Sequence, residues 1–181
     1  MKSLRLLICG ITLLLQASCN TISSKNANPL MLTLEMDQHE ISSFTDIQGY
    51  IYLLNQSDSS VLVHKRLYYF TFPIPPFIAE VQILISDSSG KLVYNDHVYP
   101  NYDLPSGDTM GVLKPNEQVA RKIYHLESDG FSASMFKKGE TYTIVAIYQN
   151  DLDITKTIDG VEVSSWVGSI RSNEETFVIL P

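Results

Sequence analysis

Side chains with oxygen ligands recur at calcium-binding spacing in one acidic segment, residues 151–162. Counted from the first residue of the segment, they occupy positions one, three, five, seven, nine and twelve: Asp151, Asp153, Thr155, Thr157, Asp159 and Glu162. Hard oxygens at this spacing can surround Ca²⁺, with the last carboxylate binding through both of its oxygens. Lys156 occupies position six, where the sharp bend needs glycine, and the flanking residues are typical of strands. We therefore expect an acidic, solvated loop between strands, and calcium binding is the weaker alternative.

Histidine and serine residues form no recognisable catalytic or zinc-binding pattern. The four histidines are His39, His64, His97 and His125. None of them has the spacing of a zinc site built from one segment. His64 and His125 fall in predicted strands, where we expect solvent-facing or half-buried side chains. Ser134 and Lys137 have the Ser-x-x-Lys spacing of one acyl-enzyme class, but the partner motifs of that class are missing. We expect no enzymatic activity, no bound metal and no cofactor.

Aromatic and proline residues crowd the segment 68–77, with five aromatics and three prolines in ten residues. Proline lacks the backbone donor of a strand ladder, so this segment cannot be a regular central strand throughout. If it is exposed, it forms a patch that binds a partner or ligand; if it folds back, it plugs one end of the domain, which we slightly prefer. The candidate patch residues are Tyr69, Phe70, Phe72, Phe77 and Trp166. For Trp166 we prefer a core or rim position over a role in stacking on sugars.

An export signal is predicted at residues 1–18. Lys2 and Arg5 make the start basic, an apolar run of about ten residues follows, and small residues precede Cys19. The apolar run is shorter than the roughly 20 residues that span a bilayer as a helix. We therefore expect this segment to be removed on export.

The segment Leu15-Gln16-Ala17-Ser18-Cys19 resembles the lipobox of bacterial lipoproteins. The resemblance implies that Cys19 becomes the first residue of the exported protein and carries acyl chains, palmitate among them, on the periplasmic or extracellular face of the cell envelope. More than one acyl chain gives durable membrane attachment. The alternative is an ordinary secretory signal with Cys19 as a bystander. Because Cys9 lies in the signal, no free thiol would remain for a disulfide or a metal site.

Charge excludes some partners. The net charge of the full chain is −7 and that of the signal is +2, so the net charge of the exported part is about −9. A surface with this much negative charge argues against nucleic acid as a partner, because Lys and Arg side chains are needed to contact its phosphates. It also argues against a basic patch that docks on anionic lipid. The expected partners are the membrane, through the lipid, and a protein or another envelope component.

Beyond a short tether, residues 19–29, the hydrophobic period is two. Predicted strands cover residues 30–36, 47–54, 61–63 with a possible continuation over 67–70, 81–85, 91–94, 118–126, 141–148, 161–163 and 176–180. No window has helical periodicity. Eight or nine short strands favour an antiparallel β-sandwich, because half-polar strands need a second sheet to cover their apolar face. A single closed sheet is the alternative.

Residues 110–180 resemble bacterial immunoglobulin-like domains. Leu113-Lys114-Pro115-Asn116-Glu117 is similar to the Leu-x-Pro-Gly-Glu turn of that family, with Asn116 as a replacement that tolerates the left-handed conformation. Gly139 and Tyr142 are similar to the Gly-x-Tyr opening of a later core strand. The resemblance implies an immunoglobulin-like β-sandwich over residues 30–181.

These observations predict a non-catalytic binding or structural module of the cell envelope. The alternative is a domain like a protease inhibitor, which presents an exposed loop at 70–77 or 101–110 to an enzyme. An envelope enzyme whose residues meet only in three dimensions is less favoured, as is a calcium-binding module.

Overall fold

The structure is a computed structural model of the chain that describes residues 28–67, 69–70, 80–93, 107–123, 126 and 136–181. Thirteen strands and two short 3₁₀ turns, Phe44–Asp46 and Gly107–Thr109, occur in these ranges. No α-helix occurs among them, and none of their helical turns could cross a membrane. The protein is therefore all-β.

Three strands form one antiparallel sheet in the order β1-β3-β8. They cover Leu30–Met36, Gly49–Asn55 and Gln118–Ile123. Alternate residues of β1, from Leu30 to Met36, are buried, while Met31 and Glu35 face solvent. This alternation is the period of a half-buried strand, and the predicted strand 30–36 is confirmed with the same bounds.

A larger sheet has the order β2-β13-β9-β6-β5, and β12 pairs with β9 beside β13. Its strands are β2 (Glu40–Ile41), β5 (Tyr69–Phe70), β6 (Val81–Asp87), β9 (Thr141–Asn150), β12 (Gly168–Arg171) and β13 (Glu175–Ile179). Most neighbours are antiparallel, but the short β2 and β5 run parallel to β13 and β6. The predicted antiparallel architecture therefore holds for all the longer strands.

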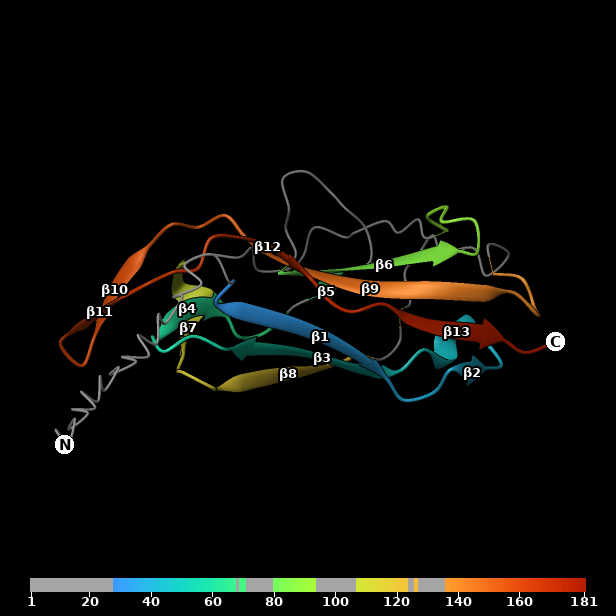
Figure 1. Cartoon of the computed structure of the whole chain (residues 1–181), viewed down its shortest axis with the longest axis horizontal. Coiled ribbons are helices and arrows are strands. Elements are labelled where there is room, and N and C mark those ends of the chain that lie inside the picture. Colours follow the sequence, from blue (N-terminus) through green and yellow to red (C-terminus); the bar gives the residue numbers. More distant parts are fainter. Residues whose placement is uncertain (1–27, 68, 71–79, 94–106, 124–125, 127–135) are drawn as a thin grey trace, which may run out of the picture.

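The two sheets lie as layers that share one apolar core, with β1, β3 and β8 below β6, β9 and β13 in Figure 1. This arrangement is compatible with a β-sandwich. An aromatic cluster fills the end near the C-terminus: Phe136 lies 4.6 Å from Phe44 and 4.7 Å from Tyr142 between ring centroids, and Tyr142 stacks on Phe177. Aromatic pairs of this kind add directional packing to the burial of area.

Four strands build the opposite end (Figure 1). β4 (Val61–His64) pairs with β7 (Met110–Leu113), and β10 (Thr155–Ile158) pairs with β11 (Val161–Ser164) as a projecting hairpin. We call residues 155–164 the hairpin arm. A second small core of Leu62, Met110 and Val163 joins the two strand pairs.

The hairpin arm corrects the prediction of a solvated loop over residues 151–162. Asp159 and Gly160 have φ angles of 52° and 79°, which are the positive values that a two-residue type I′ turn requires. Asp-Gly is a favoured pair for this turn, and Val161–Ser164 after it alternates apolar and polar residues, whereas Thr155–Ile158 before it alternates exposed and half-buried positions. The acidic residues of the segment obscured this strand signal.

Other differences from the predicted strands are local. The possible continuation of 61–63 through 67–70 is interrupted at residues 65–67, where Leu67 has φ 47°. Of the predicted strand 91–94, the structure describes residues 91–93, which make one isolated bridge, between Leu92 and Ser86. The short β2, β7, β10 and β12 were not predicted, because two to four residues give little periodicity.

Two turns have residues with a left-handed backbone, and one of the two was expected from the sequence. Asn116 has φ 59°, the left-handed conformation expected of a glycine replacement. Before β9, the backbone N–H of Lys137 donates to the hydroxyl of Tyr142 at 2.6 Å, and Gly139 between them has φ 80°. The Tyr142 ring is 1% exposed, so this bond fixes the turn to the core.

We expect Tyr142→Phe to lower the free energy of unfolding by about 1–3 kcal/mol, because the N–H of Lys137 loses its acceptor. Urea denaturation measures this change. Tyr50→Phe is the matched control: it removes the same hydroxyl from the half-buried outer face of β3 and should change stability by less than about 0.5 kcal/mol. Equal losses in the two variants would contradict the role of the Tyr142 hydroxyl.

Candidate functional site at the hairpin end

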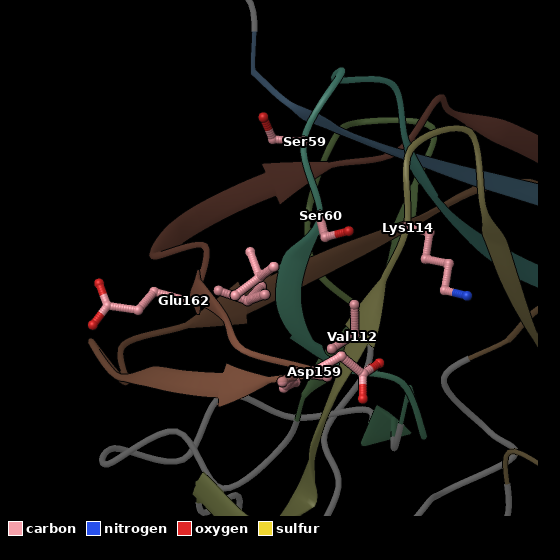
Figure 2. A pocket seen from close by; sticks show the side chains of 9 residues that line it. Ser59, Ser60, Val112, Lys114, Asp159 and Glu162 are labelled. Carbon is pink, nitrogen blue, oxygen red and sulfur yellow. The ribbon is translucent and has the colours of Figure 1, made fainter.

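A pocket lies between the hairpin arm and the β4–β7 pair (Figure 2). Its volume is about 460 Å³, and it is lined by Ser59, Ser60, Val112, Lys114, Ile158, Asp159, Val161, Glu162 and Val163. Volumes in this range are typical of sites that bind small ligands or side chains. The pocket is formed by three segments that are distant in sequence.

The lining has an apolar floor and a charged rim. Val112, Ile158 and Val163 are half-buried or buried, and Val161 is 62% exposed. Lys114 lies on the side of β7, whereas the Glu162 carboxylate points away from the pocket on the opposite side (Figure 2). Among the residues that line the pocket, the hydroxyls of Ser59 and Ser60 have no neighbouring histidine to act as a base. An apolar lining with a few polar groups is typical of a site that binds a ligand or a side chain.

Polar side chains fix the β4–β7 wall of the pocket. The Nζ of Lys65 donates to the carbonyl of Val112 at 2.9 Å and to Glu117 at 2.6 Å. Glu117 also accepts from the backbone N–H of Lys114 at 2.8 Å. These donors, the Lys114 amide first and Lys65 second, lower the pKa of Glu117. The turn that carries Lys114 is therefore held by one ionised carboxylate.

Buried amides hold the other two segments of the pocket. The side chain of Asn55 donates to the carbonyls of Ser59 and Leu113, at 2.8 and 3.0 Å, which fixes the loop before β4. At the base of the hairpin arm, Asn150 donates to the carbonyls of Leu152 and Trp166. Both amides are nearly inaccessible, 0% and 3% exposed, so their bonds are made in a low-dielectric interior where they specify geometry.

A network of polar side chains extends from the end of β4. We call it the His64 cluster: the buried His64, Glu80 and Tyr148, with the half-buried Arg66 and Thr109. The His64 ring lies 2.9 Å from the hydroxyl of Thr109 and 3.8 Å from the carboxylate of Glu80. Glu80 accepts from the Nε and terminal nitrogens of Arg66 at 2.8 and 2.6 Å. The Tyr148 hydroxyl accepts from the backbone N–H of His64. The cluster thus joins β4 to β9 and to the residue before β6.

His64 is 1% exposed, which corrects the prediction of a solvent-facing or half-buried side chain. Burial lowers the pKa of His64, while the nearby Glu80 carboxylate opposes the shift. Burial also raises the pKa of Tyr148. A neutral histidine and a neutral tyrosine at pH 7 are consistent with a structural network.

The His64 cluster has the residue types of an acid–base site, but its three central side chains are buried. Glu80, His64 and Tyr148 are 0–1% exposed, and a general base must reach the proton that it abstracts. The arrangement fixes strands instead. A buried carboxylate is costly to desolvate, and the contacts of Arg66 offset part of that cost.

The predicted calcium residues do not converge. Asp151 and Asp153 lie at the base of the hairpin arm, Thr155 begins β10, Asp159 is in the turn, and Glu162 is in β11. At about 3.3 Å per strand residue, the base and the turn are well over 10 Å apart, so these side chains cannot surround one ion. Among the described residues, no group of three or more His, Cys, Asp or Glu is placed to hold a metal.

Two of the five residues of the predicted aromatic patch lie outside the described residues. Tyr69 and Phe70 form β5, whereas Phe72 and Phe77 lie outside the described residues, as does Cys19. Trp166 is half-buried and packs against Tyr148 with tilted rings whose centroids are 5.7 Å apart. Of the two loops proposed for an inhibitor, 70–77 and 101–110, only residue 70 and residues 107–110 are described.

The pocket and the ion pair between Arg66 and the buried Glu80 were not predicted from the sequence. Charged residues are normally exposed, so Arg66 and Glu80 gave no signal. The pocket had one sequence signal, the Asp159-Gly160 turn between alternating residues, which marks a hairpin.

Comparison with known proteins finds no matching family model and no matching curated protein. The conclusions about function therefore rest on the residues and their geometry.

The His64 cluster predicts loss of stability at mildly acidic pH. The pKa of His64 is lower in the folded protein than the ordinary value of 6.5, so the unfolded chain binds more protons as the pH falls below about 6.5. The free energy of unfolding should therefore decrease as the pH falls from 7.5 through the folded pKa. Urea denaturation at several pH values measures this slope. His64→Gln should flatten it even if the variant is less stable, and an unchanged slope would refute the assignment.

Calcium should not raise the melting temperature, because the acidic residues of 151–162 lie along a hairpin rather than around one point. A ligand at one hundred times its Kd would add about 2.7 kcal/mol, a shift of several degrees that differential scanning calorimetry detects readily. A rise that a chelator reverses would show that the segment does bind the ion.

Proposed function

We propose that this chain is a lipoprotein of the bacterial cell envelope, with a signal peptide at 1–18, a lipid on Cys19, a tether to residue 29 and an immunoglobulin-like domain at 30–181. The domain is a non-catalytic binding or structural module that works through its hairpin end. The observation that carries this role is the projecting hairpin arm, whose apolar side borders an open pocket.

The strand order supports the immunoglobulin-like assignment. In such domains the first, second and fifth strands share one sheet, and the third, sixth and seventh share the other. Here β1, β3 and β8 would be A, B and E, and β6, β9 and β13 would be C, F and G. One strand departs from the pattern, because β7 in the place of D pairs with β4. The bond from Lys137 to Tyr142 supports the same assignment, because a tyrosine at the start of strand F commonly bonds the backbone just upstream.

The assignment explains where the hairpin arm lies. It is inserted between the strands F and G of the proposed fold, and β4 lies between B and C. Loops at these two positions meet at one end of immunoglobulin-like sandwiches, where variable domains bind their ligands. Fold alone does not establish function, so the exposed Val161 and the pocket beside it carry the argument.

The tether would leave from the same end. Leu30 pairs with Asn55 in the first sheet, and Asn55 bonds Ser59 of the pocket. The backbone N–H of Gln56 donates to the carbonyl of Pro29 at 2.8 Å. A tether over residues 19–29 reaches at most about 35 Å, so the proposed anchor keeps the hairpin end near the membrane surface.

Cys19→Ala should abolish incorporation of a labelled fatty acid and release the protein from the membrane fraction of a bacterial host, because acyl chains supply the attachment. Cys9→Ala is the matched control, since that cysteine lies in the predicted signal, and it should retain both lipid and membrane association. Membrane association that survives Cys19→Ala would refute the anchor.

A further inference from the structure

The edge of β11 that faces away from β10 is open next to the pocket. The segment after β11 touches β4 at one isolated parallel bridge, Leu62 with Ser165, where the N–H of Trp166 donates to the carbonyl of Leu62 at 3.1 Å. Among the described residues, no bridge joins β11 itself to β4. The pocket occupies this opening.

The hairpin register shows which backbone groups face the opening. Ile158 and Val161 flank the two-residue turn, and such a flanking pair exchanges its ladder bonds within the hairpin. In the next pair, Thr157 and Glu162, the backbone groups point away from the partner strand. The N–H and carbonyl of Glu162 therefore lie on the open edge, where an added strand could bind them.

Side chains on the two faces of the hairpin arm set the chemistry of an added strand. On the inner face, Val161 and Val163 border the pocket with Val112. On the outer face, Glu162 is exposed and points to solvent (Figure 2). A strand beside β11 would therefore need apolar residues on one face and basic residues on the other, because opposite charges on neighbouring strands attract.

Charge on the hairpin arm itself favours a basic partner, and the one cation that lines the pocket, Lys114, lies on the opposite side from Glu162 (Figure 2). Residues 151–164 contain four carboxylates, Asp151, Asp153, Asp159 and Glu162, and one ammonium, Lys156. Lys156 is directed to the carbonyl of Met110 at 3.4 Å, on the other face from Glu162. A second copy of this chain is a poorer partner, because pairing β11 with itself would bring two Glu162 side chains close together.

We propose that the open edge of β11 binds an extended basic segment of a partner protein by strand addition, with alternating apolar and basic side chains. Its apolar residues enter the pocket against Val112, Val161 and Val163, and its basic residues lie beside Glu162. Strand addition of this kind combines main-chain hydrogen bonds with pockets for alternate side chains. The inference rests on the proposed binding role and names the partner chemistry of that site.

The test uses the full chain, purified in detergent, and a short peptide of alternating valine and lysine with blocked ends. Isothermal titration calorimetry should detect binding. The same peptide with glutamate in place of lysine should not bind measurably. A third peptide, N-methylated at alternate residues on the bonding edge, should bind at least about tenfold more weakly, because it loses main-chain donors.

Two pairs of variants locate the site. Glu162→Lys should weaken binding of the basic peptide by at least about tenfold, whereas Glu174→Lys, which reverses an exposed carboxylate outside the arm, should not. Glu162→Pro should also weaken it, because proline removes a donor on the open edge but no ladder bond to β10. Thr157→Pro is its control on the other edge of the hairpin. Circular dichroism verifies that each variant is folded.

Three outcomes would overturn the inference. Absence of peptide binding would exclude this partner chemistry, while lipid labelling at Cys19 would still test the proposed envelope function separately. Binding that tolerates N-methylation and Glu162→Pro would show charge attraction without strand addition. A dimer in sedimentation that Glu162→Pro dissociates would show that a second copy occupies the edge.

Discussion

Burial of β9 in the middle of the larger sheet is the constraint on which the rest of the structure depends. The strand pairs with β6 on one edge and with β13 and then β12 on the other, so both of its edges are satisfied. Tyr142, Ile144, Ala146 and Tyr148 are each 0–1% exposed, and full burial of a large apolar side chain contributes about 1.5–3 kcal/mol. A shift of one residue would turn this entire face away from the core. The register of β9 therefore fixes where Asn150 ends the strand and where the hairpin arm begins.

The hairpin arm is held in a different way from the sandwich. Its apolar core is small, with Leu62, Met110 and Val163 as the buried members. Its base is held by hydrogen bonds of the Asn150 and Ser165 side chains. Hydrogen bonds are directional, whereas apolar contacts are not. A few polar groups can therefore fix the orientation of the hairpin arm although other residues cover its apolar side only in part. This incomplete coverage leaves the pocket open.

The sequence predicted those elements whose side chains alternate over many residues. β1 and β9 were predicted because their apolar faces repeat with a period of two. β10 was not predicted, because its threonines and the neighbouring aspartates also matched the spacing of oxygen ligands in a calcium-binding loop. The interruption after His64 depends on the left-handed backbone of Leu67, which no local pattern indicates. The pocket could not be predicted, since periodicity shows which face of a strand is buried but not which distant strands diverge.

Glu162 gives the hairpin arm both selectivity and protection. An exposed strand edge is a template for uncontrolled pairing, and proteins usually guard such edges with charges or proline. β11 contains no proline or lysine, so Glu162 is the one residue of this strand whose charge can oppose uncontrolled pairing. A carboxylate repels a second copy of the same edge but attracts a basic strand. The residue that limits self-association would thus also select the partner, and this dual role needs no change in the fold.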